Sequence, residues 1–216
     1  MIIETLEVAG IRSAMRAMRN PWDSWSRSDS RLSDQDGYIV GKNDAELSRS
    51  LSDAGTEHCK HLRLIDVWAD VTASLKFYSQ LDTYRMGVDK VSCSTMHTIT
   101  RKEFVPEMFE VPDQVSINHM NMLRDAWWNA KQDGNNQGME FYKNQLLYSI
   151  PSSFLQTRTY KFSYAALAAM YQQRKNHRLP EWHIFCDWIR CLPYSFLIIP
   201  ELPIPEDLDK ASGEES

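Results

Sequence analysis

The chain has 216 residues, of which 43% are hydrophobic and 11% aromatic, a composition typical of a globular domain with its own core. Its 29 acidic and 24 basic side chains give a formal net charge of −5, which argues against a general nucleic-acid-binding protein, because such proteins normally carry a basic excess. A small phosphorylated ligand is compatible with this charge, since it needs only a few placed cations. No apolar run approaches the roughly 18 residues of a membrane helix, and residues 1–4 lack the basic start of a signal peptide. We therefore expect a cytoplasmic protein that binds neither membranes nor nucleic acids.

The cysteines and histidines do not spell out a metal centre. His58 and His61 are three residues apart and could share a metal on one helical face, but no third ligand stands nearby, so we expect no metal. Cys93 could be a nucleophile with His97 as its base, although a small thiol is more often packed as an apolar group. The cysteines form no CxxC pair and are expected to be reduced thiols. They are Cys59, Cys93, Cys186 and Cys191.

The N-terminal segment is expected to begin with a strand and a short helix. Residues 2–8 have the β-branched content of a strand, and residues 11–19 have apolar residues at helical spacing. This helix places Arg12, Arg16 and Arg19 on one face, and such a face is either a solvated surface or an anion site.

Residues 20–37 are rich in Ser, Asp, Trp and Arg and show no periodicity, so we expect a loop that could be mobile. Trp22 and Trp25 lie in this loop. A large aromatic side chain in a polar loop either anchors the loop to the core or faces a ligand, and the sequence leaves both interpretations open. Residues 38–40 are consistent with a short strand that ends at Gly41.

The next elements are a helix over residues 44–54, capped by Asn43 or Asp44, and a short helix over residues 55–64. The buried side of the first helix should hold Leu47, Leu51 and Ala54. Residues 64–72 alternate between apolar and polar and predict a half-buried strand, after which a helix is expected over residues 74–85.

The C-terminal half is mostly helical in pattern, with Ser116 and Ser163 as expected helix caps and Pro180 as a helix start. Residues 101–115 are expected to form a loop, and residues 152–162 a strand. Helices are expected over 117–132, 138–148, 163–175 and 180–192. The total of about six helices and three to five strands indicates an α+β fold. We expect one domain over residues 1–205, followed by an acidic disordered tail over residues 206–216.

The stretch Phe77–His97 is the most informative part of the chain. Its second half, Val91–His97, is small, hydroxyl-rich and almost without charge, so it can line a pocket with hydrogen-bonding groups. Gln80, Tyr84 and Arg85 would point at it from the end of the preceding helix.

This stretch resembles the signature of the flavin-dependent thymidylate synthases, the ThyX family. The family pattern is Q-x-x-R-H-R-x-x-S followed by N-E-x-S-x-R. Gln80, Arg85 and Ser94 match this pattern, whereas Tyr84 stands where the family has histidine and Ser92 where it has glutamate. Downstream, Arg174 falls on the family arginine that contacts the pyrimidine, and the similarity extends over roughly residues 44–192.

The resemblance implies an antiparallel sheet flanked by helices, a homotetramer, and methylation of a pyrimidine deoxynucleotide at C5, as in the conversion of dUMP to dTMP. It implies FAD as the cofactor, with NADPH and methylenetetrahydrofolate as co-substrates; a related transfer such as hydroxymethylation would use the same pocket. Gln80, Ser94, Thr95 and Arg174 would bind the nucleotide, with Ser94 and Arg174 as the catalytic residues. The implied flavin contacts are His58, Tyr84, Arg85 and Ser92.

Several positions depart from the family pattern and motivate a second hypothesis. Thr83 and Met96 stand where the family has arginine, and Ala165 and Ala169 replace residues that hold the adenylate part of the flavin. The alternative is therefore a catalytically inactive protein of this fold that still binds a nucleotide or a flavin. A third possibility is a small helical interaction module without a ligand.

Overall fold

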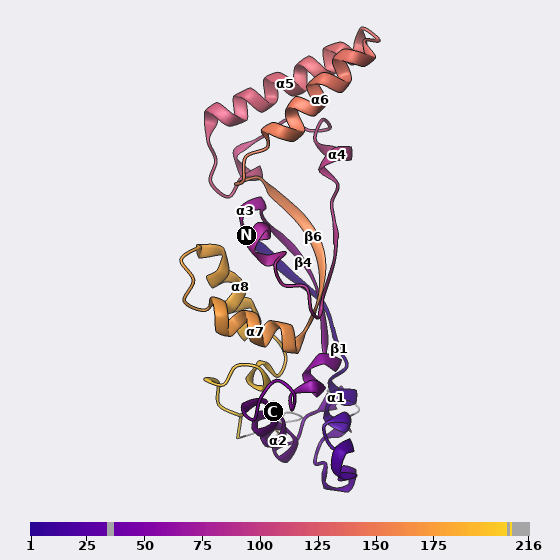
Figure 1. The fold of residues 1–216 in the computed structure, drawn as a ribbon, viewed down its shortest axis with the longest axis vertical. Coiled ribbons are helices and arrows are strands. Elements are labelled where there is room, and N and C mark those ends of the chain that lie inside the picture. Colours follow the sequence, from indigo (N-terminus) through magenta and orange to yellow (C-terminus); the bar gives the residue numbers. More distant parts are fainter. Residues whose placement is uncertain (34–36, 207, 209–216) are drawn as a thin grey trace, which may run out of the picture. The chain divides into compact units, whose positions relative to one another are not determined.

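The computed structural model describes residues 1–33, 37–206 and 208 (Figure 1). Its helices are α1 (Ile11–Ala17), α2 (Lys42–Asp53), α3 (Leu75–Leu81), α4 (Thr95–Thr98), α5 (Gln114–Gln132), α6 (Asn136–Ser149), α7 (Tyr164–Arg174) and α8 (Pro180–Arg190). Its strands are β1 (Ile2–Ala9), β2 (Arg31–Ser33), β3 (Gly37–Ile39), β4 (Asp66–Ser74), β5 (Val88–Ser92) and β6 (Leu155–Ser163). The predicted α+β class with antiparallel sheets is confirmed. Most of the tail predicted over residues 206–216 lies outside the described residues.

The chain folds into two compact units. Unit 1 consists of Met1–Ile3, Asp70–Thr83 and Lys90–Thr159, and unit 2 consists of Glu4–Ala69, Tyr84–Asp89 and Tyr160–Ser216. A four-stranded sheet has the order β1-β4-β6-β5, and a two-stranded antiparallel sheet pairs β2 with β3. No helix in the described part of the chain is long and apolar enough to cross a membrane.

Strand β4 follows the predicted alternation. Val67, Ala69, Val71 and Ala73 are fully buried, while the residues between them are half-buried. Period-two burial of this kind is what a strand with one face on the core produces, so the sequence pattern was sufficient to predict it.

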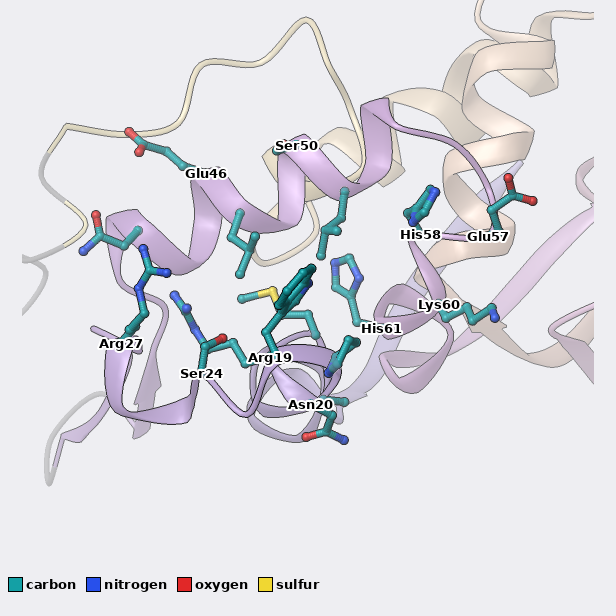
Figure 2. A pocket seen from close by; sticks show the side chains of 17 residues that line it. Arg19, Asn20, Ser24, Arg27, Glu46, Ser50, Glu57, His58, Lys60 and His61 are labelled. Carbon is teal, nitrogen blue, oxygen red and sulfur yellow. The ribbon is translucent and has the colours of Figure 1, made fainter.

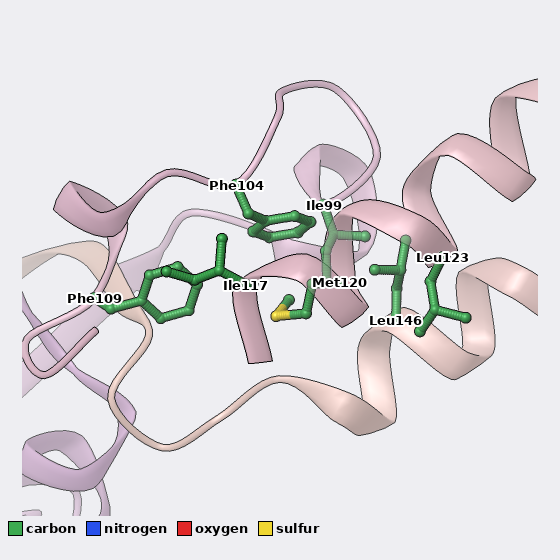
Figure 3. Packing of buried hydrophobic residues seen from close by; sticks show 7 residues of the cluster. All are labelled: Ile99, Phe104, Phe109, Ile117, Met120, Leu123 and Leu146. Atoms are coloured by element: carbon green, nitrogen blue, oxygen red, sulfur yellow. The ribbon is translucent and has the colours of Figure 1, made fainter. Parts of the chain in front are cut away.

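The core of unit 1 lies under the paired helices α5 and α6, which pack against each other (Figure 1). Figure 3 shows its buried cluster, which consists of Ile99, Phe104, Phe109, Ile117, Met120, Leu123 and Leu146. The prediction that Ser116 caps α5 was wrong. The cap is Asp113, whose carboxylate accepts the backbone N–H of Ser116 at 2.9 Å. The Ser116 hydroxyl itself donates to Asp113 at 2.6 Å, because a carboxylate is the stronger acceptor.

The stretch after α3 differs from the prediction. The helix ends at Leu81 rather than Arg85, and the Thr83 hydroxyl donates back to the Gln80 carbonyl at 2.7 Å. Residues Val88–Ser92, which are not among the predicted strands, form strand β5. Gly87 permits this turn, because it has φ of 70° and a Cβ added to it would lie 2.3 Å from Ser163 Oγ.

Helix α2 is held by a buried ion pair that the sequence did not reveal. The Asp44 carboxylate is fully buried and accepts Arg19 Nε at 2.6 Å. Its other oxygen accepts the hydroxyls of Ser28 and Ser30, each at 2.5 Å. The prediction that Asn43 or Asp44 caps the helix was therefore wrong, and the cap is supplied from elsewhere in the chain.

The cap of α2 is Asp29, whose carboxylate accepts the backbone N–H groups of residues 43 and 44 at 2.7 and 3.0 Å. The buried face is also different from the prediction, because Ala45 and Ser48 are buried whereas Ala54 is exposed. Leu47 and Leu51 are only partly buried.

The segment predicted as a loop over residues 20–37 contains more structure than expected. It has two 3-10 turns, Asn20–Trp22 and Trp25–Arg27, and it includes β2; its residues 34–36 lie outside the described part. In the C-terminal part, by contrast, the Ser163 cap and the inward side of α8 are as predicted. The Ser163 hydroxyl accepts the Ala166 backbone N–H at 3.2 Å, and Trp182 is fully buried.

We expect Asp44→Asn to lower the free energy of unfolding by about 3–5 kcal/mol, because it leaves the buried Arg19 guanidinium without its counter-charge. Urea unfolding followed by circular dichroism measures this. Asp53→Asn is the matched control on the exposed end of the same helix, and it should change the value by no more than about 0.5 kcal/mol. Equal effects of the two substitutions would show that the ion pair is unimportant for stability.

Candidate functional site

Unit 2 contains a cavity of about 910 Å³ (Figure 2). One side comes from α2, including Glu46 and Ser50, and the opposite side comes from the end of α1 and the turns after it, including Arg19 and Arg27. Residues before and within the 3-10 turn Lys60–Leu64 complete the lining. The volume lies in the range of about 300–1,000 Å³ that holds a cofactor or a drug-sized ligand.

His61 is the buried polar group of this cavity. Its side chain is only 3% exposed, and its Nε2 lies 2.7 Å from the Ser48 hydroxyl. Its Nδ1 makes no hydrogen bond of ordinary geometry within the described part of the chain. Burial lowers the pKa of His61 to about 4, against a smaller opposing effect of the His58 backbone, so the ring is neutral at pH 7.

The rim of the cavity carries charges of both signs. His58 and Lys60 lie on one side, as Figure 2 shows, and Glu57 stands beside them; all three are exposed. Trp22 also belongs to the lining and is 87% exposed, so this tryptophan does not anchor its segment in the core. The arrangement can accept a planar, partly polar ligand with its charged end at the rim.

A second polar constellation in unit 2 surrounds Arg174 at the end of α7. Arg174 Nε donates to the Tyr84 hydroxyl at 2.8 Å, and that hydroxyl donates to Gln173 Oε1 at 2.8 Å. The guanidinium also lies 4.8 Å from the ring centroid of Trp182 on α8. Partial burial and the neighbouring Arg174 charge lower the pKa of His177. The result is a cation fixed in orientation by two aromatic side chains.

In unit 1, the remaining predicted residues lie on β5, α3 and α4. Ser92 ends β5, and Ser94 precedes α4; both are exposed. The Ser94 carbonyl accepts the Thr98 hydroxyl at 2.8 Å, and the Ser94 side chain makes no hydrogen bond that caps α4. Thr95 begins α4, and Gln80 is half-buried on α3.

Unit 1 also contains an ion-pair group that the sequence did not reveal. Arg158 on β6 contacts Asp82 at 3.1 Å and lies 3.8 Å over the Tyr78 ring, and Lys90 pairs with the same carboxylate. Although burial opposes it, the hydrogen bonds from Lys90 and Arg158 hold the pKa of Asp82 below its ordinary value. The sequence feature that could have indicated this group is Arg158 itself. It is a single arginine in a strand of hydroxyl and aromatic residues, and a partly buried cation needs an acidic partner.

The predicted residues therefore fall into separate groups. Tyr84 and Arg174 are brought into direct contact, although 90 positions separate them in the chain. His58 belongs to the large cavity, and Arg85 is exposed next to Tyr84. In residues 1–33, 37–206 and 208, no group of three or more His, Cys, Asp or Glu side chains could hold a metal ion, and all four cysteines are free.

The depressed pKa of His61 predicts a loss of stability in mild acid. The unfolded chain takes up a proton below about pH 6.5, whereas the native ring stays neutral until about pH 4. The free energy of unfolding is therefore highest above pH 6.5, and it decreases by up to about 3 kcal/mol as the pH falls toward 4. Unfolding free energies between pH 7.5 and 4.5, compared for wild type and His61→Gln, measure this.

The substitution should flatten the wild-type pH dependence over this interval. His119→Gln, at an exposed histidine, is the control and should leave the dependence unchanged. A His61→Gln variant with the wild-type slope would show that His61 is not the titrating group.

No protein-family model matches the chain, and no curated protein matches it. Among solved structures, it is similar to thymidylate synthase X (ThyX) from Helicobacter pylori in a crystal structure with FAD and dUMP. The identity is 18% and the TM-score 0.69, over 97% of this chain and 100% of that chain. A second structure of the Helicobacter pylori flavin-dependent thymidylate synthase, complexed with FAD and dUMP, gives 18% identity and a TM-score of 0.71 over 94% and 100% of the two chains. The chain therefore has a distant ThyX-like fold, as its sequence motifs predicted.

Proposed function

We propose that this protein is a divergent, ThyX-like, flavin-dependent enzyme that transfers a one-carbon unit to C5 of a pyrimidine deoxynucleotide. The observation that carries the proposal is the fold likeness, over 97% of the chain, to a thymidylate synthase whose structure contains FAD and dUMP. The reaction would be the methylation of dUMP or a related transfer such as hydroxymethylation.

The Arg174 constellation supports a nucleotide site. A guanidinium that is oriented by the Tyr84 hydroxyl and the Trp182 ring loses little freedom when it binds a uracil oxygen or a phosphate. In the proposed reaction, Arg174 holds the pyrimidine edge and stabilises charge that develops on the ring oxygens. Gln80, Ser94 and Thr95 remain proposed nucleotide contacts on the strength of the family resemblance alone.

The large cavity of unit 2 fits part of a flavin. Its volume of about 910 Å³ suits a cofactor, and the buried His61 Nδ1 makes no hydrogen bond of ordinary geometry in the described part of the chain. His58 would bind the cofactor from the rim, and Tyr84, Arg85 and Ser92 are the further proposed contacts. When bound, FAD supplies the hydride, with NADPH and methylenetetrahydrofolate as expected co-substrates.

The protein residues would then position and shield the reactants. His61 is neutral at pH 7, so it can donate or accept one hydrogen bond without adding a charge to the cavity. Burial of the ligands in the cavity would exclude water from the reacting atoms. A homotetramer, as the resemblance implies, and a cytoplasmic location are part of this proposal.

An inactive member of the fold remains the second candidate function. The observation that favours it is Met96, which is 59% exposed where the family pattern has an arginine. Thr83, similarly placed in the pattern, uses its hydroxyl to close helix α3. A protein of this kind would bind a flavin or a nucleotide and transfer no carbon.

The visible absorption spectrum of the purified protein tests the flavin part of the proposal. We expect the absorption bands of a bound flavin, which is identified as FAD after its release. We expect the Arg85→Ala variant to lose most of the bound flavin. Arg101→Ala, at an exposed arginine of unit 1, is the control and should retain the cofactor. A protein that is colourless and gains no thermal stability from added FAD would contradict this part of the proposal.

Binding of dUMP tests the nucleotide site separately. We expect Arg174→Ala to weaken dUMP binding at least about tenfold, because a charge-assisted hydrogen bond contributes about 1.5–3 kcal/mol. Arg178→Ala is the control, four residues further on and exposed. Calorimetric titration measures both variants; equal affinities would exclude Arg174 from the site. Binding of FAD and dUMP without methyl transfer to dUMP would favour the inactive alternative.

A further inference from the structure

A smaller cavity in unit 2, of about 260 Å³, is lined by an unusual number of arginines. Four arginines contribute to it together with an aromatic ring and a phenol. The lining residues that matter here are Arg12, Arg16, Arg19, Arg31, Trp25 and Tyr38, which we call the arginine pocket. They come from α1, the residue before the 3-10 turn Asn20–Trp22, the 3-10 turn Trp25–Arg27, β2 and β3.

The charge of the arginine pocket is not balanced along helix α1. Arg12 and Arg16 are four residues apart on this helix, and its sequence, IRSAMRA, contains no acidic residue. Like charges at this spacing repel one another and disfavour the helix. Within the described part of the chain, neither Arg12 nor Arg16 forms an ion pair. An anion in the pocket would relieve this repulsion, in a protein whose overall charge is −5.

Two carboxylates of this region, those of Asp44 and Asp29, already have partners. Asp44 binds Arg19 through one oxygen and accepts two serine hydroxyls through the other. Asp29 accepts the first N–H groups of α2. The buried Arg19–Asp44 pair therefore builds the wall of the pocket without neutralising the two exposed guanidinium groups on α1.

Aromatic side chains help to orient the polar groups of the arginine pocket. The Arg16 guanidinium lies 4.8 Å from the ring centroid of Trp25, and the indole N–H donates to Asn20 Oδ1 at 2.9 Å. Tyr38 is half-buried, and burial raises its pKa, so its hydroxyl is a neutral hydrogen-bonding group at pH 7. A stacked guanidinium retains its planar, paired donors for a phosphate.

We propose that the arginine pocket binds the diphosphate group of a small phosphorylated ligand, with Arg12 and Arg16 as its principal cations. Its volume is below the range of about 300–1,000 Å³ for whole-ligand pockets, so it suits a charged head group. The inference does not rest on the proposed enzymatic function, because none of these residues belongs to the proposed flavin or nucleotide contacts.

Calorimetric titration of the full chain with inorganic pyrophosphate, at low ionic strength, tests the proposal. We expect binding that the double variant R12Q/R16Q weakens at least about tenfold, through the loss of two charge-assisted contacts. The matched control is R101Q/R178Q, which removes the same charge from two exposed arginines elsewhere and should bind as wild type does. No measurable binding to wild type, or equal weakening in both double variants, would overturn the proposal.

Two further measurements define the contact and its source. R12K/R16K keeps both charges but removes the paired donors, so we expect intermediate affinity; wild-type affinity would show only diffuse attraction and would overturn a built site. ADP in place of pyrophosphate distinguishes the ligands, since tighter binding of ADP indicates a nucleotide, and equal binding indicates a free diphosphate. Either result supports the arginine pocket, provided that R12Q/R16Q weakens the binding of the ligand.

Discussion

The buried ion pair between Arg19 and Asp44 is the interaction on which much of unit 2 depends. It joins the turn that follows α1 to the first turn of α2, and the same carboxylate accepts the hydroxyls of Ser28 and Ser30 in the segment between them. A buried charge is tolerated only when it is fully paired, so this segment must fold as one unit with both helices. Arg19 lines both cavities of unit 2, and the ion pair therefore shapes the large cavity and the arginine pocket together.

The candidate chemistry of the chain rests on cations held in fixed orientation. Arg174 is placed by the Tyr84 hydroxyl and the Trp182 ring, and in unit 1 Arg158 is placed by Asp82 and the Tyr78 ring. The ThyX-like signature itself lacks arginine at positions 83 and 96. The likeness to solved ThyX structures at 18% identity concerns the fold, and the cations of this chain lie on other strands and helices than that signature.

Local patterns predicted much of the fold. The alternation of β4, the serine cap of α7, and the inward side of α8 all follow from residues within a few positions of one another. The α+β class followed from counting such elements, and the partial motif around Gln80 to Ser94 was enough to indicate the ThyX-like fold. These features are encoded locally because helix caps and burial periodicity depend on near neighbours.

The sequence by itself determined the α+β class, the alternation of strand β4 and the approximate positions of most long helices. The tertiary structure decided which of these residues meet. The sequence predicted Asp44 as a helix cap, but its side chain is the buried partner of Arg19. The Asp29 carboxylate, which is distant in the sequence, accepts the N–H of Asn43 at the start of the helix instead. The contact of Tyr84 with Arg174 spans 90 positions, and no local pattern specifies which distant side chain satisfies a polar group that folding removes from water.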